Sequence, residues 1–325
     1  IALQLACAET LSKLGLMKEA ESFYSEIRSA LGPLSGQSAD ILQIRWANQW
    51  GYFLTELRGD PTAAKETFDE LRRNINLSAT GLQSQHAAII SSEFNIEMRL
   101  GHYDHAHLLA EESLKLAQAS RNIRAEARAW NSIGITLISL GDWQGSAESY
   151  ERALALARTI GERRLEVIAL HNLGLTRMDQ ALYAEARECQ ESYLSISRAT
   201  GNHMAESYAP STLATIAMSQ GDFDQAEALI EQSLKVAQEN DWSRLIAWNQ
   251  ALRGLLAFYR WMKSDAGQLQ IAIDAFTSSE DGWKLLDEAG EFYAALAIAT
   301  YAHAGADLAK SALERAHIAV DESWT

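Results

Sequence analysis

Residues 130–157, "WNSIGITLISLGDWQGSAESYERALALA", return in altered form forty residues later as "LHNLGLTRMDQALYAEARECQESYLSIS", residues 170–197. The two stretches align without a gap, and Gly134 falls on Gly174. A fixed period of this length is typical of repeat proteins, in which each unit packs mainly on its neighbours. This pair of stretches therefore decides the fold, provided that the period continues along the chain.

The period continues through a two-residue site that would end a helix and mostly finishes in glycine, which we call a stop. It recurs at intervals of 44, 42, 40, 40 and 40 residues. The stops are Leu14-Gly15, Arg58-Gly59, Leu100-Gly101, Leu140-Gly141, Gln180-Ala181 and Gln220-Gly221. Glycine ends a helix readily because it adopts the left-handed conformation without a Cβ penalty. Three of the stops are followed directly by aspartate, which can cap the next helix: Asp60, Asp142 and Asp222. The pattern predicts pairs of helices joined by short turns.

A second column of small residues lies inside the first helix of these pairs, at Gly134, Gly174, Ala214 and Gly254. Glycine inside a helix costs up to about 1 kcal/mol relative to alanine. Its return every forty residues therefore indicates a helix crossing that is too close for a larger side chain.

We predict an all-α solenoid of about eight antiparallel helix pairs. Only three prolines interrupt a chain rich in Ala, Leu and Glu, and no apolar run is long enough to span a membrane. First helices are expected at 3–14, 39–58, 82–100, 123–140, 163–180, 203–220, 242–262 and 283–303. Second helices are expected at 17–30, 61–73, 103–118, 143–159, 183–199, 223–238, 265–277 and 306–319.

We interpret residues 1–325 as a single repeat domain. Its best-matching core is about 80–240, and the repeats in 1–79 and 241–325 are divergent. The sequence opens at Ile1 without methionine and already in helical rhythm. We therefore expect it to be a piece of a longer protein.

Charge and cysteine content limit the partners and the compartment. The net charge of −15 opposes contact with nucleic acid and favours a basic partner at low salt, although an acidic surface can also serve solubility alone. Cys7 and Cys189 show no ligand-like spacing. Two reduced thiols suit a cytoplasmic location.

With these columns, the chain resembles the tetratricopeptide-repeat superfamily. The stretches "AWNSIGITLISLGDWQGSAESYERALALA" and "LATIAMSQGDFDQAEALIEQSLKVA" carry its signature. The forty-residue period is similar to the type in kinesin light chains, spindle-orientation adaptors and the sensor regions of bacterial signal-transduction ATPases and transcription regulators. The resemblance implies a right-handed superhelix whose first helices line a concave groove, and a binding or scaffolding role.

If the first helices face inward, one stripe of residues at helical spacing lines the groove. A mostly apolar stripe with a polar thread suits an amphipathic helix or an extended peptide. We expect roughly half of the stripe to line the groove and the rest to lie in the core between helices. The candidates are Trp46, Gln49, Phe53, Ser91, Asn95, Arg128, Asn131, His171, Met178, Tyr208, Ser211, Thr215, Met218 and Trp248.

Motifs of catalysis are absent from the sequence. No phosphate-binding loop, dinucleotide fingerprint or zinc-protease motif occurs, so we predict no enzyme activity and no cofactor in this segment. His102 and His105 could share one face of a helix and bind a metal. However, the sequence does not complete a four-ligand set, and we predict no metal site.

Two further features have more than one explanation. Glu126, Glu166 and Glu206 recur every forty residues, and the helix dipole explains acidic residues in a first turn. The alternative is a ladder of pairs with Arg124, Arg128 and Arg164.

Pro210 inside a first helix predicts a kink or a late helix start, because proline cannot donate a backbone hydrogen bond.

The functional hypothesis is a protein-interaction or ligand-sensing domain of a cytoplasmic signalling or regulatory protein. Its groove would bind a peptide, a protein or a small-molecule inducer, and the longer chain would carry an ATPase, cyclase or DNA-binding module. The alternative is a stand-alone scaffold that assembles complexes without ligand sensing.

Overall fold

The computed structural model describes residues 1–77, 79, 81–263, 265 and 267–283, and within these residues the regular structure is entirely helical. The first helices of the pairs are α1 (Ala2–Lys13), α3 (Gln37–Tyr52), α5 (Gln83–Arg99), α7 (Ile123–Ser139), α9 (Arg163–Asp179), α11 (His203–Ser219) and α13 (Ser243–Met262). The second helices are α2 (Met17–Leu31), α4 (Pro61–Asn74), α6 (Tyr103–Ala119), α8 (Trp143–Thr159), α10 (Tyr183–Thr200), α12 (Phe223–Glu239) and α14 (Gln268–Trp283).

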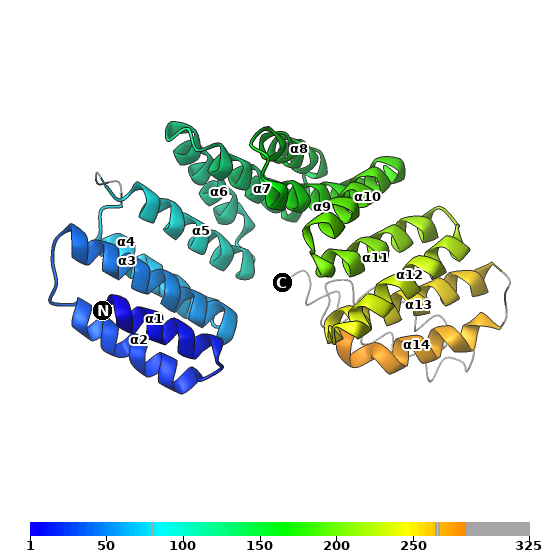
Figure 1. Ribbon diagram of the computed structural model, residues 1–325, viewed down its shortest axis with the longest axis horizontal. Helices are drawn as coiled ribbons and strands as arrows, with labels where there is room; N and C mark the ends of the chain where they lie inside the picture. The colour runs from blue at the N-terminus through cyan, green and yellow to red at the C-terminus, as the bar shows by residue number, and fades with distance from the viewer. Residues whose placement is uncertain (78, 80, 264, 266, 284–325) are drawn as a thin grey trace. The chain divides into compact units, whose positions relative to one another are not determined.

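The prediction of an all-α solenoid of helix pairs is confirmed over this part of the chain (Figure 1). The first and second helices predicted at 283–303 and 306–319 lie outside the described residues. The chain divides into two compact units, which we call unit 1 (Ile1–Leu165) and unit 2 (Glu166–Thr325). Each unit is described by itself below.

The turns between helices follow the chemistry expected of the stops. Gly141 adopts the left-handed conformation with a φ of 82°, and the Asp142 carboxylate accepts a hydrogen bond of 2.9 Å from the backbone N–H of Gly145. Ala181, which stands where the other stops have glycine, takes the same conformation with a φ of 59°. The fold therefore imposes this turn even where the sequence does not favour it.

The small column inside the first helices marks close crossings, as predicted. A Cβ atom built on Gly134 would lie 2.6 Å from the ring of Tyr150, and one on Gly254 would lie 2.9 Å from the ring of Phe276. The rings of both aromatic residues are fully buried. The second helix thus fills the space left by the missing side chain, and this contact holds the two helices of a pair together.

The end of α3 departs from the regular repeat. Residues Phe53–Leu57 form a π-helical turn, and the backbone N–H of Arg58 donates to the carbonyl of Phe53 at 3.1 Å. As a result, Gly51 lies eight residues before the stop glycine Gly59, whereas Gly134 lies seven residues before Gly141. Gly51 still faces the second helix, because a Cβ on it would lie 2.5 Å from the Phe68 ring. The π turn absorbs one additional residue.

Pro210 does not delay the start of its helix. Helix α11 begins at His203 and continues through Pro210 to Ser219, so the predicted late start is wrong. Pro210 is buried, and the carbonyl of neighbouring Ser207 accepts hydrogen bonds from the hydroxyls of Ser211 and Ser233. Side-chain donors thus serve the backbone close to the proline.

Candidate functional site

The first helices of unit 2 form a pocket of about 390 Å³. We call it the first-helix pocket, because each residue that lines it comes from α9, α11 or α13. Its lining consists of His171, Leu175, Tyr208, Ser211, Thr212, Arg244, Leu245 and Trp248. Its volume lies within the range of ligand sites in proteins, about 300–1,000 Å³.

The pocket runs obliquely across the three helices. By the forty-residue period, Tyr208 is the counterpart of Trp248, and His171 is the counterpart of Ser211. At each step, from α9 to α11 and from α11 to α13, the lining residues lie about one helical turn closer to the start of their own helix. An occupant of the pocket therefore crosses the helices diagonally and meets the first turn of α13 at one end.

Aromatic rings form much of the pocket wall. The side chain of Tyr208 is 37% exposed, and that of Trp248 is half-buried. The His171 ring packs against Tyr193 with the ring centroids 4.8 Å apart, and it meets Tyr208 edge-on at 6.4 Å. These flat, partly exposed surfaces can bind an apolar or aromatic group.

His171 supplies little positive charge to the pocket. Burial lowers the pKa of its imidazole, although a hydrogen bond involving Gln190 acts in the opposite direction. Its Nδ1 atom is buried and has no hydrogen-bond partner among the described residues. The ring is therefore neutral near pH 7 and contributes mainly aromatic surface.

Ser211 forms the floor of the pocket and belongs to a buried hydrogen-bond network. Its hydroxyl oxygen lies 2.7 Å from Ser233 Oγ and 3.0 Å from Asn249 Oδ1. Ser207 Oγ in turn donates to the backbone carbonyl of Ser233 at 2.9 Å. The network joins α11, α12 and α13 and fixes the positions of the residues above it. Ser211 is thus a structural member of the predicted stripe and is 1% exposed.

Arg244 is the residue of the pocket lining that carries a formal charge at neutral pH. It is exposed, and its guanidinium makes no ion pair or hydrogen bond with any residue that the structure describes. It stands in the first turn of α13, whose N-cap residue Trp242 supplies no side-chain hydrogen bond. Both the guanidinium and the helix start favour an anion at this end of the pocket.

The structure brings four of the predicted groove residues into this pocket: His171, Tyr208, Ser211 and Trp248. Three other candidates of unit 2 lie outside it. Thr215 is half-buried, and its hydroxyl donates to the Ser211 carbonyl at 3.3 Å. Met178 packs beside the cluster of Ala186, Leu213 and Ile216, whereas Met218 lies in the core with 4% exposure.

Among the unit 1 candidates, Ser91, Asn95 and Arg128 are exposed and Asn131 is half-buried. They lie on α5 and α7, as the stripe required. A role for them in binding a partner stays a prediction.

Two unit 1 candidates, Trp46 within α3 and Phe53 at the start of the π turn, are buried instead. Trp46 is 8% exposed, and its indole N–H donates to the Tyr24 carbonyl of α2 at 2.9 Å. Phe53 is fully buried, with its ring centroid 5.2 Å from that of Trp50. The π turn explains this correction, because counting back from the stop misses its additional residue and shifts the stripe by one position. The exposed residues between positions 44 and 56 are instead Arg45, Tyr52 and Glu56.

Gln49, the third candidate of this helix, connects two first helices. Its amide nitrogen donates to a carboxylate oxygen of Glu9 on α1 at 3.1 Å, and its amide oxygen is buried and has no hydrogen-bond partner among the described residues.

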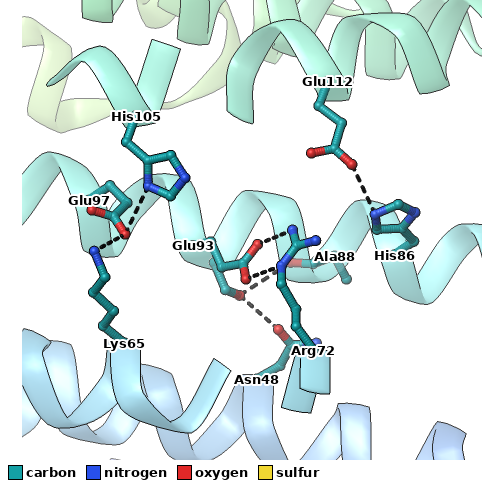
Figure 2. A network of polar contacts seen from close by, with 10 residues as sticks. Asn48, Lys65, Arg72, His86, Ala88, Glu93, Glu97, His105 and Glu112 are labelled. Carbon is teal, nitrogen blue, oxygen red and sulfur yellow. Dashed lines mark hydrogen bonds and ion pairs between the residues drawn. The ribbon is translucent and has the colours of Figure 1, made fainter. Parts of the chain in front are cut away.

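A second pocket, of about 280 Å³, lies among α4, α5 and α6 in unit 1. Figure 2 shows Lys65 and His105 pointing toward Glu97, and Arg72 pointing toward Glu93. The Lys65 ammonium lies 2.8 Å from Glu97 Oε1, and Arg72 Nη2 lies 2.5 Å from Glu93 Oε2. These groups largely satisfy each other, so this pocket has less unpaired charge to offer a ligand.

The histidines that raised the question of a metal site converge on Glu97. His102 Nδ1 lies 2.7 Å and His105 Nδ1 3.1 Å from its carboxylate oxygens. Burial raises the pKa of Glu97, but hydrogen bonds from Lys65, His102 and His105 outweigh burial and leave the pKa below its usual value. In the described part of the chain, no three His, Cys, Asp or Glu side chains are arranged so that they could hold a metal ion. Sequence reasoning missed Glu97, which is 3% exposed.

The recurring glutamates stand where the dipole explanation requires. Glu126, Glu166 and Glu206 lie in the first turns of α7, α9 and α11. Arg124 pairs with Glu162, which is outside this column. Glu206 contacts His203 of its own first turn at 3.1 Å.

Comparisons with known proteins identify the repeat. The sequence model of the tetratricopeptide repeat matches residues 125–199 and 165–239. Residues 125–239 are tetratricopeptide repeats. The resemblance read from the sequence is therefore confirmed for the central repeats, and no curated protein sequence matches the chain.

Solved structures share the fold at low sequence identity. Aspartyl phosphate phosphatase F from Bacillus subtilis has a TM-score of 0.70 and 11% identity, covering 97% of this chain and 92% of that one. The apo form of RapI has a TM-score of 0.68 and 14% identity, covering 86% and 98%. A signal-transduction ATPase with a tetratricopeptide-repeat sensor from Pyrococcus horikoshii has a TM-score of 0.68 and 16% identity over 88% of this chain. This chain spans 42% of that ATPase.

The described residues contain no helix that is long and apolar enough to cross a membrane.

Proposed function

We propose that this chain is a protein-interaction domain that binds a peptide, or an extended segment of a protein, in the first-helix pocket of unit 2. The observation that carries the proposal is the meeting of His171, Tyr208 and Trp248 from three successive first helices in one pocket. Partly exposed aromatic rings over a rigid floor are suited to anchoring a side chain of a partner.

Other proteins with this fold support a peptide as the ligand. NprR in complex with its cognate peptide NprX has a TM-score of 0.57 and 14% identity to this chain. A Rap protein complexed with competence and sporulation factor also has a TM-score of 0.57. These likenesses are of fold alone, so the choice of ligand rests on the pocket of this chain.

The finer part of the proposal is ligand sensing. In this view, occupancy of the pocket is relayed to a neighbouring module of a cytoplasmic signalling protein, and the segment itself has no enzymatic activity. The tetratricopeptide-repeat sensor of the Pyrococcus horikoshii ATPase supports this role by its fold. A scaffold without sensing would bind partners over several faces, and small molecules would cause no thermal shift.

A display selection tests the proposal. Random 12-residue peptides displayed on mRNA are selected against the intact chain and against the Tyr208→Ala variant. We expect enriched peptides that bind the intact chain and stabilise it in thermal unfolding. Their affinity should fall about ten-fold in the variant, because Tyr208 supplies exposed aromatic surface in the pocket.

The control is Tyr52→Ala in unit 1, since Tyr52 is 63% exposed and lies outside the pocket. It should bind the same peptides with unchanged affinity. Equal loss in both variants, or peptides indifferent to Tyr208→Ala, would remove the first-helix pocket from the function.

A further inference from the structure

The charge of the first-helix pocket is opposite to that of the chain as a whole. The chain carries a net charge of −15, yet no acidic side chain is among the residues that line this pocket. Arg244 is the charged residue of that lining, and His171 is neutral through burial. Long-range attraction therefore favours basic partners, whereas contact inside the pocket favours an anionic group.

The guanidinium of Arg244 is free to bind such a group. The two other arginines of α13 are engaged: Arg253 lies 3.4 Å from Glu231, and Arg260 contacts both Asp224 and Glu227. Arg244 has no such partner among the described residues. A planar guanidinium can form two parallel hydrogen bonds to one carboxylate.

The start of α13 adds to this preference. The first backbone N–H groups of a helix lack partners within the helix, and no side chain caps those of α13. A carboxylate beside Arg244 would lie near these groups and near the positive end of the helix dipole. The guanidinium and the helix start thus act on the same anion.

Apolar surface lies next to this charge. Trp248 follows Arg244 by four residues, and the two side chains therefore share one face of α13. Leu245 of the same turn and Tyr208 of α11 complete this part of the lining. The spacing places an aromatic wall about one helical turn along α13 from the residue that carries the cation.

Building on the proposed function, we propose that the first-helix pocket selects peptides in which a carboxylate stands beside an apolar or aromatic side chain. The carboxylate binds Arg244 at the start of α13, and the apolar side chain packs between Tyr208 and Trp248. The carboxylate belongs to an Asp or Glu side chain or to a free C-terminus.

Charge reversal at Arg244 tests this assignment. Peptides from a random 12-residue mRNA-display library are selected in parallel on the intact chain, on Arg244→Glu and on Arg164→Glu. Arg164 is the counterpart of Arg244 two repeats earlier and is also an exposed arginine in the first turn of a first helix, but it does not line the pocket. Circular dichroism and thermal unfolding check that all three proteins are folded.

On the intact chain and on Arg164→Glu, we expect enrichment of Asp or Glu next to Phe, Trp, Tyr or Leu. On Arg244→Glu, the acidic residues should give way to Lys or Arg at the same position. An enriched acidic peptide should bind Arg244→Glu at least ten-fold more weakly, and its binding to the intact chain should weaken as salt rises.

Synthesis of the enriched peptides as free acids and as C-terminal amides distinguishes the two sources of carboxylate. A peptide that ends in an apolar residue should gain affinity as the free acid if the C-terminus is the group bound. Equal affinity of both forms assigns the contact to an Asp or Glu side chain.

The outcomes separate this inference from the function on which it rests. Peptides that require Tyr208 but lack a carboxylate, and that bind Arg244→Glu as well as the intact chain, overturn the inference and leave the proposed function standing. Failure to enrich any peptide that depends on Tyr208 overturns both.

Discussion

The first helices of the two units present different chemistry on the same repeat. In unit 1 several of their polar side chains bind one another: Gln49 to Glu9 at 3.1 Å, Ser92 to Asn48 at 2.8 Å, and Arg99 to Glu56 at 2.5 Å. In unit 2 the first helices instead surround a pocket with partly exposed aromatic rings and an arginine that has no partner among the described residues. One helical frame thus supports two kinds of surface.

The difference shows where a repeat protein can carry a binding site. Polar groups that are already paired gain little from a ligand, because the ligand must replace hydrogen bonds that exist. Unpaired groups on a rigid floor gain a partner without losing one. The close crossing of a first helix over an aromatic ring of its second helix occurs in both units, so this difference can arise without disturbing the fold.

The largest expected effect concerns the paired charges of unit 1. Glu97→Gln keeps the volume of the side chain but removes the charge that Lys65, His102 and His105 share. We expect a loss of about 2–3 kcal/mol of unfolding free energy, somewhat less than for a fully buried pair because these partners are partly exposed. Urea unfolding measures it.

Glu111→Gln is the matched control on α6, since Glu111 is 45% exposed and its contacts with His107 and Lys115 are 3.8 and 3.9 Å long. Its effect should stay within about 0.5 kcal/mol. Similar losses in both variants would show that the network around Glu97 contributes no more than surface charges.

The second prediction asks whether the two units share their internal packing. Gly134→Ala in unit 1 and Gly254→Ala in unit 2 each place a Cβ within 3 Å of a buried ring. The clash outweighs the helix propensity gained, about 1 kcal/mol, and we expect each variant to lose about 1–2 kcal/mol. Thermal unfolding of both variants compares them. A stabilised variant in either unit would mean that its crossing is looser than the structure shows.

The smallest effect is the order in which acid weakens the units. Burial lowers the pKa of His171 below its ordinary 6.5, so the stability that its neutral form contributes is present above that pH and is lost as pH falls through the lowered value. The pKa of Glu97 is also lowered, so the stability that its charged form contributes is lost only as pH falls below 4.5. Hydrogen exchange at pH 5.5 should therefore show weaker protection around His171 in unit 2, while protection around Glu97 in unit 1 stays unchanged. Simultaneous loss of protection in both units would contradict this order.

Much of the fold could be predicted from the sequence because the repeat is locally encoded. The helix predicted at 123–140 is Ile123–Ser139, and the crossing at Gly134 follows from its recurrence alone. The prediction failed for Trp46 and Phe53, since nothing in the local pattern of α3 shows a π turn. Only the additional residue between Gly51 and its stop could have indicated it.

The candidate site was predictable in part. His171, Tyr208 and Trp248 follow from helical spacing, but Arg244 was missed because the stripe was read straight across the helices. The pocket crosses them obliquely, and the angle depends on how neighbouring pairs pack. Glu97 was missed for a related reason, because its partners come from two other helices. An acidic residue four positions before a stop, next to a histidine-rich turn, was the available signal.

The π turn at Phe53–Leu57 has a consequence for how such chains can change in length. A residue gained inside a first helix was accommodated by widening one turn, and the glycine before it still meets the aromatic ring of its partner helix. Length variation between repeats is therefore not confined to the connecting segments. Where it falls within a helix, it rotates the preceding side chains by about 100° and so changes which of them face outward without altering the interlocked pair.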